Sequence, residues 1–186
     1  MLTPVKKSQY GTPVFIIPKK EGTVRFITDY RRLNQKLVRK TYLLPRIGET
    51  IQQLKGFQYE KVFDLNMGYY TIRLYPASQD MTTIDTEFGK LKYDRLPMGM
   101  YASGDIFQAK VDEPLGDIEG IKMCINDILV LGKDIFKNHI DQMRITFGRL
   151  RAAGLKVNTP KCSFGLKDMH YLGYVITRKV IKPNPK

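Results

Sequence analysis

Residues 62–70 read Val-Phe-Asp-Leu-Asn-Met-Gly-Tyr-Tyr, and residues 124–131 read Cys-Ile-Asn-Asp-Ile-Leu-Val-Leu. Each segment places an acidic residue at the edge of an apolar run with strand character, Asp64 in the first and Asp127 in the second. Two carboxylates at strand ends that converge in space can hold the divalent metal ions of phosphoryl transfer. The amide of Asn126 stands beside Asp127, where a second carboxylate would be expected.

Both segments also have a purely structural interpretation. A carboxylate at a strand end is most often a surface or capping residue, and Asn and Asp are ordinary residues of hairpin turns. The pair Asn126-Asp127 is expected to form a tight turn between two strands in either case. The residues alone leave both interpretations open, because the metal site requires this turn to bring Asp127 beside Asp64.

Short apolar runs dominate the chain, and a few helical patterns interrupt them. Runs bounded by glycine, proline and charged residues predict strands, some of them paired as hairpins. The mixed order of elements predicts an α+β fold with a largely antiparallel sheet. The expected strands are residues 12–17, 24–28, 59–63, 70–74, 82–86, 90–93, 121–125, 128–131, 155–157, 162–164 and 171–176, and the expected helices begin at Pro45, Ser103 and about residue 134.

Each expected helix has one apolar face, which is typical of packing against a core. Pro45 suits the first turn of the first helix and Gly56 its end, whereas Ser103 is the expected cap of the second helix. Gly154 is the expected stop of the third. The residues expected to face inward are Ile47, Ile51 and Leu54; Ile106, Phe107 and Val111; and Phe136, Ile140, Met143, Phe147 and Leu150.

The net charge of +13 is concentrated near the N-terminus. Residues 1–46 hold eleven Lys or Arg and two Asp or Glu, a net charge of +9. Such asymmetry indicates a polyanionic partner, commonly nucleic acid, although a solvated basic surface without a partner has the same composition. Basic side chains gather around the hairpin expected at residues 12–28.

Other features exclude several classes of protein. No apolar run approaches the ~20 residues of a membrane span, and no secretory signal is recognisable at the start. Cys124 and Cys162 predict buried thiols and no disulfide framework, and His139 and His170 lack metal-ligand spacing. We therefore expect an intracellular protein of one domain, or of two lobes that share a core, with no membrane partner.

In order along the chain, these segments resemble the reverse transcriptase domain of gypsy-type long-terminal-repeat retrotransposon Pol polyproteins. The resemblance extends from about Gly11 to Ile181. It rests on Thr12-Pro13-Val14, Lys19-Lys20-Glu21-Gly22, residues 25–34, Leu44-Pro45-Arg46-Ile47, residues 63–69, Arg95-Leu96-Pro97-Met98-Gly99, Ser103, Ile106-Phe107-Gln108, residues 124–130, residues 154–158, Lys161-Cys162 and Tyr171-Leu172-Gly173-Tyr174.

The resemblance implies the fingers and palm of a right-hand polymerase, with an antiparallel palm sheet backed by helices. Fingers would comprise residues 1–58 and about 78–98, and palm residues 59–77 and 99–177. Residues 178–186 would begin the connection to a thumb that the chain lacks. The remainder of a Pol polyprotein, including thumb, RNase H and integrase, is expected as a partner, in a cytoplasmic particle or the nucleus.

The same resemblance implies an RNA-directed DNA polymerase that extends a primer on an RNA or DNA template with dNTPs and two Mg²⁺ or Mn²⁺ ions. Its implied site residues fall into three groups. Asp64, the backbone of Leu65 and Asp127 would bind metal; Lys19, Arg25, Tyr69 and Met98 would bind the dNTP, with Tyr69 rejecting a ribose 2′-hydroxyl; and Gln108, Tyr171, Leu172 and Gly173 would contact template or primer.

The chain departs from the family pattern at several motif positions. Asn126 replaces an aspartate that bridges both ions in this family, and an amide has one acceptor oxygen and no charge. We expect a rate loss of at least ~10²-fold, by analogy with the removal of other single electrostatic stabilisers. Cys124 replaces a tyrosine, and Ala102 and Gly104 flank Ser103 where Asn and Pro are usual.

Two hypotheses follow from these departures. The chain is either a working polymerase domain impaired by Asn126, or an inactive relic that still binds nucleic acid. A third interpretation, an unrelated basic RNA-binding domain, requires the ordered series of motifs to be accidental.

Overall fold

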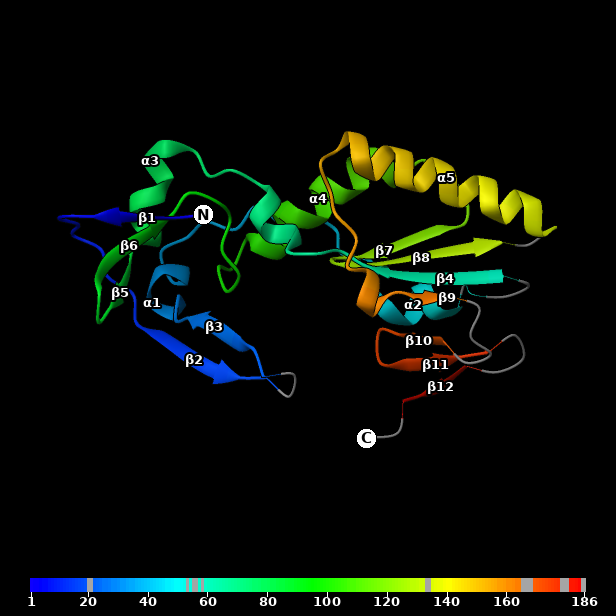
Figure 1. The fold of residues 1–186 in the computed structure, drawn as a ribbon, viewed down its shortest axis with the longest axis horizontal. Coiled ribbons are helices and arrows are strands. Elements are labelled where there is room, and N and C mark those ends of the chain that lie inside the picture. The colour runs from blue at the N-terminus through cyan, green and yellow to red at the C-terminus, as the bar shows by residue number, and fades with distance from the viewer. Residues whose placement is uncertain are drawn as a thin grey trace. The chain divides into compact units, whose positions relative to one another are not determined.

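The computed structural model describes residues 1–19, 22–52, 54, 57, 59–132, 135–164, 169–177 and 181–184 of the chain. The chain divides into two compact units. The first comprises Met1–Thr41 and Tyr69–Phe107, and the second comprises Tyr42–Gly68 and Gln108–Lys186 (Figure 1). Within the described ranges, no helix is long and apolar enough to cross a membrane.

The first unit contains two small antiparallel sheets. In one, β1 (Leu2–Val5), β6 (Gly89–Tyr93) and β5 (Ile84–Thr86) lie in that order. The other is the hairpin of β2 (Val14–Pro18) and β3 (Val24–Thr28). The hairpin predicted at residues 12–28 is confirmed, and the strands expected at 82–86 and 90–93 also pair with each other. The tip of the β2–β3 hairpin lies partly outside the described residues. Helical turns of this unit include α1 (Arg31–Asn34), α3 (Pro76–Gln79) and η2 (Asp80–Thr82).

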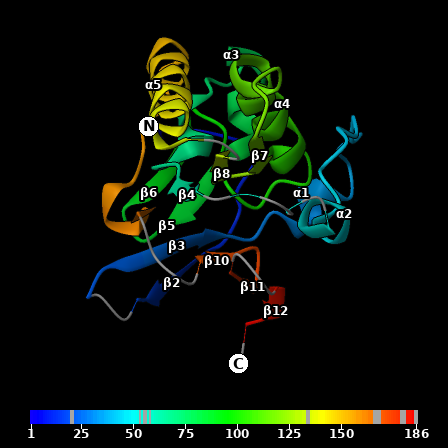
Figure 2. The same cartoon turned by 90° about the vertical axis from the view of Figure 1, so that its right-hand side faces the viewer.

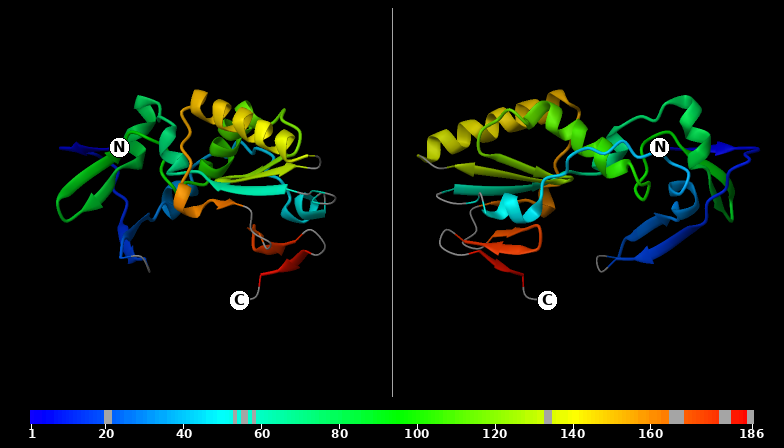
Figure 3. Two further views of the ribbon diagram at one scale, coloured as in Figure 1. Left: turned by 45° about the vertical axis from the view of Figure 1, so that its right-hand side comes forward. Right: turned by 180° about the vertical axis from the view of Figure 1, so that it is seen from behind.

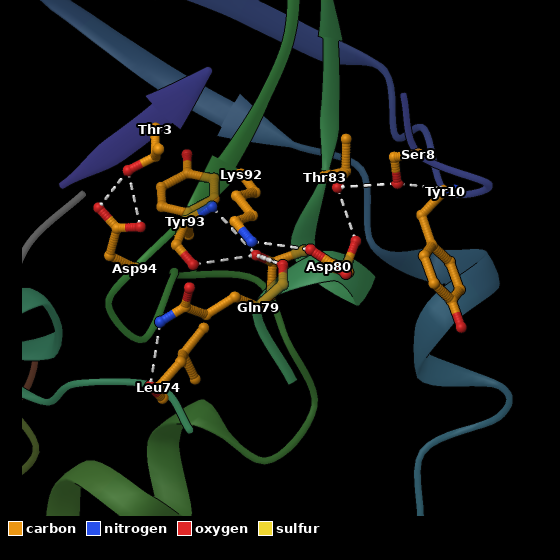
Figure 4. Close-up of polar contacts among 11 residues, drawn as sticks. Thr3, Ser8, Tyr10, Leu74, Gln79, Asp80, Thr83, Lys92, Tyr93 and Asp94 are labelled. Atoms are coloured by element: carbon orange, nitrogen blue, oxygen red, sulfur yellow. Dashed lines mark hydrogen bonds and ion pairs between the residues drawn. The ribbon is translucent and has the colours of Figure 1, made fainter. Parts of the chain in front are cut away.

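Threonine hydroxyls fix the entry into β5, as Figure 4 shows in part. The Thr82 hydroxyl accepts a hydrogen bond from the Tyr93 N–H at 3.1 Å. The Thr83 hydroxyl donates to the Asp80 carbonyl at 2.6 Å, and Lys92 Nζ lies 2.9 Å from Asp80 Oδ1. These bonds hold a 3-10 turn at residues 80–82. The expected strand at 82–86 therefore begins two residues later than predicted.

The prediction of a strand at residues 70–74 is wrong. Gly68–Thr71 form a 3-10 turn, η1, and only an isolated bridge at Arg73 follows it. The Tyr70 ring stacks on the Tyr93 ring with 6.2 Å between centroids. The strand propensity of this aromatic run is overridden by such tertiary packing, which a single-sequence pattern cannot anticipate.

The second unit is built around a four-stranded antiparallel sheet. Its order is β7 (Ile121–Cys124), β8 (Asp127–Gly132), β4 (Tyr59–Asp64) and β9 (Ser163–Phe164). The long helix α5 (Phe136–Ala152) covers one face of this sheet (Figures 1 and 2). The predicted α+β architecture with an antiparallel sheet is therefore observed.

Side chains alternate between the two faces of β4, as in any strand. Phe63 is fully buried on the face of α5, where its ring meets that of Phe147 edge-on at 4.9 Å between centroids. Val62 points to the other face, toward α2 (Ile47–Gln52). The core on that face consists of Ile51, Leu54, Phe57, Val62, Leu129, Leu131, Tyr171 and Ile176.

A separate three-stranded sheet packs against this second core, and Figure 3 shows it on the side of α2. It consists of β10 (Met169–Tyr171), β11 (Tyr174–Ile176) and β12 (Ile181–Pro183). The strand expected at residues 171–176 is therefore two strands joined by a turn. The strand expected at 155–157 is reduced to a single bridge from Val157.

The buried face of helix α5 matches the expected one only in part, since Leu150 is buried as predicted. His139, Thr146 and Leu150 are buried, whereas Phe136 is 54% exposed and Phe147 37% exposed. The Thr146 hydroxyl donates to a carbonyl of its own helix at 2.8 Å, so this polar residue can be buried without losing a hydrogen bond. A pattern of apolar residues alone could not predict this buried threonine, and it overestimated the burial of Phe136 and Phe147.

The end of α5 is as predicted. Gly154 has φ +70°, in the left-handed region that glycine enters without steric cost. The N–H of Leu155 donates to the carbonyl of Leu150 at 2.9 Å, the six-residue bond of a Schellman motif.

Two further helix predictions need correction. In α4 (Ser103–Leu115), Phe107 and Val111 are buried as expected, but Ile106 is 43% exposed. Ser103 is the first helical residue, and its hydroxyl donates to a loop carbonyl at 2.7 Å. Which side of the helix is covered therefore depends on the surrounding structure as well as on the apolar character of its residues.

Helix α2 begins at Ile47, two residues after the proline that was expected to open it. Ile51 and Leu54 are buried, but Ile47 is 41% exposed. The N–H of Thr50 donates to the carbonyl of Arg46 at 2.9 Å, so Pro45 lies just before the first hydrogen-bonded turn of the helix. The predicted stop at Gly56 lies outside the described residues.

Candidate active site

The carboxylates of Asp64 and Asp127 are brought together by strand pairing. Asp64 ends β4, Asp127 begins β8, and the two are direct register partners in the antiparallel ladder. The alternation of the strands places both on the face that carries Val62 and Leu129, away from α5. The structure therefore unites the two acidic positions singled out in the sequence.

Asp64 is held from the segment after α5. Asn158 Nδ2 donates to Asp64 Oδ1 at 3.2 Å, and the Asn158 N–H donates to the Asp64 carbonyl at 2.8 Å. Lys161 Nζ lies 3.9 Å from Asp64 Oδ1. The Lys161 side chain is 63% exposed, so water screens this ion pair. Asn158 is the stronger positioning contact.

The charged form of the Asp127 carboxylate is disfavoured in the absence of a cation. Burial raises the pKa of its carboxyl, and the nearby charge of Asp64 raises it further. Lys161 opposes the shift and is the smallest of the three influences. Two partly desolvated carboxylates that repel each other favour binding of a cation between them. The geometry thus suits a divalent metal ion.

The turn between β7 and β8 is one residue earlier than predicted. Cys124 pairs with Asp127, so the two turn residues are Ile125 and Asn126. Ile125 has φ +55°, whereas Asn126 is absent from the positive-φ residues. This pattern fits a type II′ turn, whose first position normally holds glycine. A β-branched residue there is strained and must be held by its surroundings.

The side chain of Asn126 offers an unused ligand atom. Its Oδ1 is buried and finds no hydrogen-bond partner. A buried amide oxygen without a partner is costly unless something binds it. Amide and carboxylate oxygens are both among the donors that Mg²⁺ and Mn²⁺ prefer.

This donor set is one charge weaker than three carboxylates. In the described part of the chain, no three His, Cys, Asp or Glu side chains are close enough to hold a metal ion. The two paired carboxylates of Asp64 and Asp127 are oxygen ligands that suit a hard divalent cation. The expected backbone ligand, Leu65, lies next to Asp64, and its N–H donates to the Asn126 carbonyl at 2.9 Å.

Tyr171 lies under this site. It is 2% exposed and belongs to the apolar core of the α2 face. Burial raises the pKa of its phenol, and the charges of Cys124 and Asp127 act in the same direction. Its hydroxyl has no hydrogen-bond partner in the described structure. Tyr171 therefore packs in the core on the same face of the sheet as the two carboxylates.

Leu172 and Gly173 form the turn between β10 and β11. Their φ angles are +49° and +82°, the paired positive values of a type I′ turn. They follow Tyr171 directly, so the three residues expected to contact a primer lie together in the second unit.

Gln108 has a different environment from the one expected. It is fully buried, and its side chain bonds to the Ile125 N–H and to Asp112. It lies in the second unit with the acidic pair.

The residues expected to contact a dNTP belong to the first unit. Arg25 lies opposite Ile17 in the β2–β3 hairpin, and Lys19 follows β2. The Tyr69 ring packs against Phe107 with 4.9 Å between centroids. Met98 is 45% exposed.

Sequence reasoning missed two features around the acidic pair. Asn158 gave no signal as a partner of Asp64, because the contact spans 94 residues of sequence. The cysteines, predicted to be buried, are only partly buried. Cys162 Sγ donates to the Asn158 carbonyl at 3.2 Å, and burial raises the pKa of both thiols.

Comparison with known proteins gives consistent matches. A family model described as "Reverse transcriptase (RNA-dependent DNA polymerase)" matches residues 17–176. The Pol polyprotein from transposon opus of Drosophila melanogaster is 33% identical over 187 residues, which cover 96% of this chain and 18% of the relative. The transposon Tf2-7 polyprotein of Schizosaccharomyces pombe is 27% identical over 178 residues, 95% of this chain and 13% of the relative. The chain thus spans less than a fifth of these curated relatives.

Solved structures of similar fold are also found. The foamy viral protease-reverse transcriptase in complex with RNA/DNA hybrid has a TM-score of 0.90 and 25% identity, over 98% of this chain and 24% of that one. A second structure, the foamy viral protease-reverse transcriptase dRH in complex with double-stranded DNA, has a TM-score of 0.81 and 25% identity, over 95% of this chain and 31% of that one. The expected polymerase fold is confirmed by this likeness.

Proposed function

Because the chain belongs to the reverse transcriptase (RNA-dependent DNA polymerase) family, we propose that it forms the fingers and palm of a retrotransposon polymerase. In this proposal it transfers dNTPs to a primer 3′-hydroxyl with the help of two divalent metal ions. The observation that carries the proposal is the register pairing of Asp64 with Asp127 at the end of the central sheet.

The chain's own residues have defined tasks in this mechanism. Asp64 and Asp127 would hold the ions, with the carbonyl of Leu65 as a further ligand. When bound, the ions would activate the primer hydroxyl and neutralise the charge that develops on the transferred phosphate. Asn158 keeps the Asp64 carboxylate oriented through its 3.2 Å hydrogen bond.

Asn126 limits this activity in our proposal. Its neutral amide supplies an oxygen but no charge where the family has a carboxylate. The residues present would then compensate less of the repulsion between two bound dications. A loss of at least ~10²-fold in rate follows by analogy with other lost electrostatic stabilisers.

We propose an RNA or DNA template with its primer as the macromolecular ligand. The basic N-terminal quarter supports this proposal, since phosphate contacts dominate nucleic-acid affinity. The foamy viral relative has been solved with an RNA/DNA hybrid and with double-stranded DNA. Lys19 and Arg25 would hold the triphosphate, Tyr69 and Met98 the dNTP sugar and base, and Tyr171, Leu172 and Gly173 the primer end.

The division into fingers and palm remains as proposed from sequence. Fingers would comprise residues 1–58 and about 78–98, palm 59–77 and 99–177, and residues 178–186 would lead toward a thumb. The two compact units support a two-part arrangement, with boundaries at other residues. The rest of a Pol polyprotein would assemble with this domain inside the cell, in a cytoplasmic particle or the nucleus.

Primer extension on an RNA template tests the function directly. The native chain and Asp64→Ala are compared with dNTPs and either Mg²⁺ or Mn²⁺. Extension by the native chain that Asp64→Ala abolishes would support the enzyme. Absence of extension from a folded native chain that still binds primer-template would favour the second candidate, an inactive relic that binds nucleic acid, which Asn126 suggests.

A further inference from the structure

Gln108 is a buried polar residue beside the site, and both polar atoms of its side chain form hydrogen bonds. It has no solvent exposure. Its Oε1 accepts the N–H of Ile125 at 2.7 Å, and its Nε2 donates to Asp112 Oδ1 at 2.8 Å. These bonds fix the orientation of the amide, because only its oxygen can accept and only its nitrogen can donate.

The atom that Gln108 binds belongs to the strained turn. Ile125 has φ +55°, which costs a β-branched residue energy that a glycine would avoid. A backbone in such a region persists only when its surroundings hold it there. The turn is held on one side by Gln108 and on the other by the hydrogen bond from Leu65 N–H to the Asn126 carbonyl, 2.9 Å long.

We propose that Gln108 is a positioning residue, which holds the Ile125-Asn126 turn in its strained form and so keeps Asn126 and Asp127 in place against Asp64. This inference rests on the proposed function for its catalytic meaning. It is an alternative to the template contact expected from sequence, since the side chain has no exposure in this structure.

Asp112 is the second hydrogen-bond partner of the Gln108 side chain. It accepts from Gln108 and is only partly buried, because it lines an open pocket of about 540 Å³ in the second unit. Tyr42 lines the same pocket, and hydrogen bonding to Asp112 raises the pKa of its phenol. Asp112 therefore connects a solvent-accessible surface to the turn through one buried amide.

The first test removes both hydrogen bonds of Gln108. Gln108→Met keeps the length of the side chain but has neither the acceptor nor the donor. We expect the Ile125 amide to exchange at least about tenfold faster in hydrogen-exchange NMR, because about one hydrogen bond is lost. Mn²⁺ affinity, measured by EPR titration, should fall as well. Lys110→Met, on the same helix with a 42% exposed side chain, is the matched control and should change neither.

The second test reverses the donor and the acceptor. Gln108→Glu still accepts from Ile125 but presents a carboxylate to Asp112, so the two repel and exchange should accelerate. Adding Asp112→Asn supplies a donor to that carboxylate and should return the Ile125 exchange rate to within about threefold of native. This pair keeps the test decisive if Gln108→Met fails to fold.

Three results would overturn the proposal. The first is native exchange of Ile125 in Gln108→Met or Gln108→Glu. The second is no rescue in the double variant. The third is weaker primer-template binding in Gln108→Glu with Ile125 exchange unchanged, which would restore the template contact. Hydrogen exchange is measured without metal or primer, so it tests the role of Gln108 independently of catalysis. If the native chain binds no Mn²⁺ and extends no primer, that result would count against the proposed enzyme activity and not against the role of Gln108.

Discussion

The N–H of Leu65 donates to the carbonyl oxygen of Asn126 at 2.9 Å. This bond joins the residue after Asp64 to the residue before Asp127, and so it closes the end of the β4–β8 ladder. A slip of one residue in that ladder would turn one carboxylate to the opposite face of the sheet. The hydrogen bond is thus part of what keeps the two acidic side chains on one face.

Replacement of Asp127 is expected to stabilise the metal-free chain. The pKa of its carboxyl is raised in the folded state, so the folded chain binds more protons than the unfolded chain between the two pKa values. Stability therefore falls as pH rises through that window and stays lower above it. Asp127→Asn should raise the Tm at pH 7 in EDTA, and the gain should disappear below about pH 4.

Asp117→Asn is the control of opposite sign for this prediction. The hydrogen bond from Arg149 lowers the pKa of Asp117, so its charge contributes stability that is present above the unfolded pKa and lost as pH falls. The Asp117 side chain is 68% exposed, and the effect of its removal at pH 7 should be small and destabilising. A lower Tm at pH 7 for Asp127→Asn would contradict the account of an unfavourable carboxylate pair.

Gly132 is expected to be indispensable for the packing of α5. A Cβ at this position would lie 2.8 Å from His139 Nδ1 and 2.9 Å from His139 Cβ. Gly132→Ala should therefore lower the free energy of unfolding by about 1–3 kcal/mol in urea denaturation, because the core is overpacked. Gly148→Ala, within α5, meets nothing within 4 Å and should stabilise by about 0.5–1 kcal/mol. Equal effects of the two substitutions would refute this view of the helix–sheet contact.

The ion pair of Arg39 with Asp105 should be much stronger than those at the surface. Arg39 Nε lies 2.5 Å from Asp105 Oδ2, and the Asp105 side chain is 1% exposed. Arg39→Met removes the cation from beside this buried carboxylate and should cost about 3–5 kcal/mol of unfolding free energy.

Arg46→Met serves as the comparison for this pair. Its partner Glu49 is 63% exposed, so we expect a cost of about 0–1 kcal/mol. Urea or thermal unfolding of both variants measures the two losses of unfolding free energy. A difference of less than about 1 kcal/mol between them would show that Asp105 is better solvated than its burial indicates.

The sequence was a good guide to the central sheet and to its acidic pair. Apolar runs that end at Asp64 and begin at Asp127 carry the period-two pattern of strands, and the structure pairs them in register. The predicted resemblance to the reverse transcriptase domain of a gypsy-type retrotransposon is confirmed by the family match and by the transposon relatives. Local patterns and ordered motifs were sufficient for these conclusions.

Features decided by tertiary packing could not be predicted in the same way. The turn at Ile125-Asn126 contradicts local preference, because an isoleucine takes a backbone conformation suited to glycine. His139 and Thr146 are buried against the sheet, whereas Phe136 and Phe147 contact sheet aromatics but stay partly exposed. Each depends on a partner distant in sequence or on a hydrogen bond within the helix, which neither periodicity nor composition encodes.

The most direct test of the central claim is the rate of primer extension by Asn126→Asp in Mg²⁺, measured beside the native chain and Asp64→Ala. If Asp64 and Asp127 form a two-metal polymerase site weakened by Asn126, the restored carboxylate should raise the rate at least ~10²-fold, while Asp64→Ala stays inactive. Circular dichroism and primer-template binding should be the same for all three chains. A rate for Asn126→Asp no higher than native, in a folded chain that binds primer-template, would contradict the account.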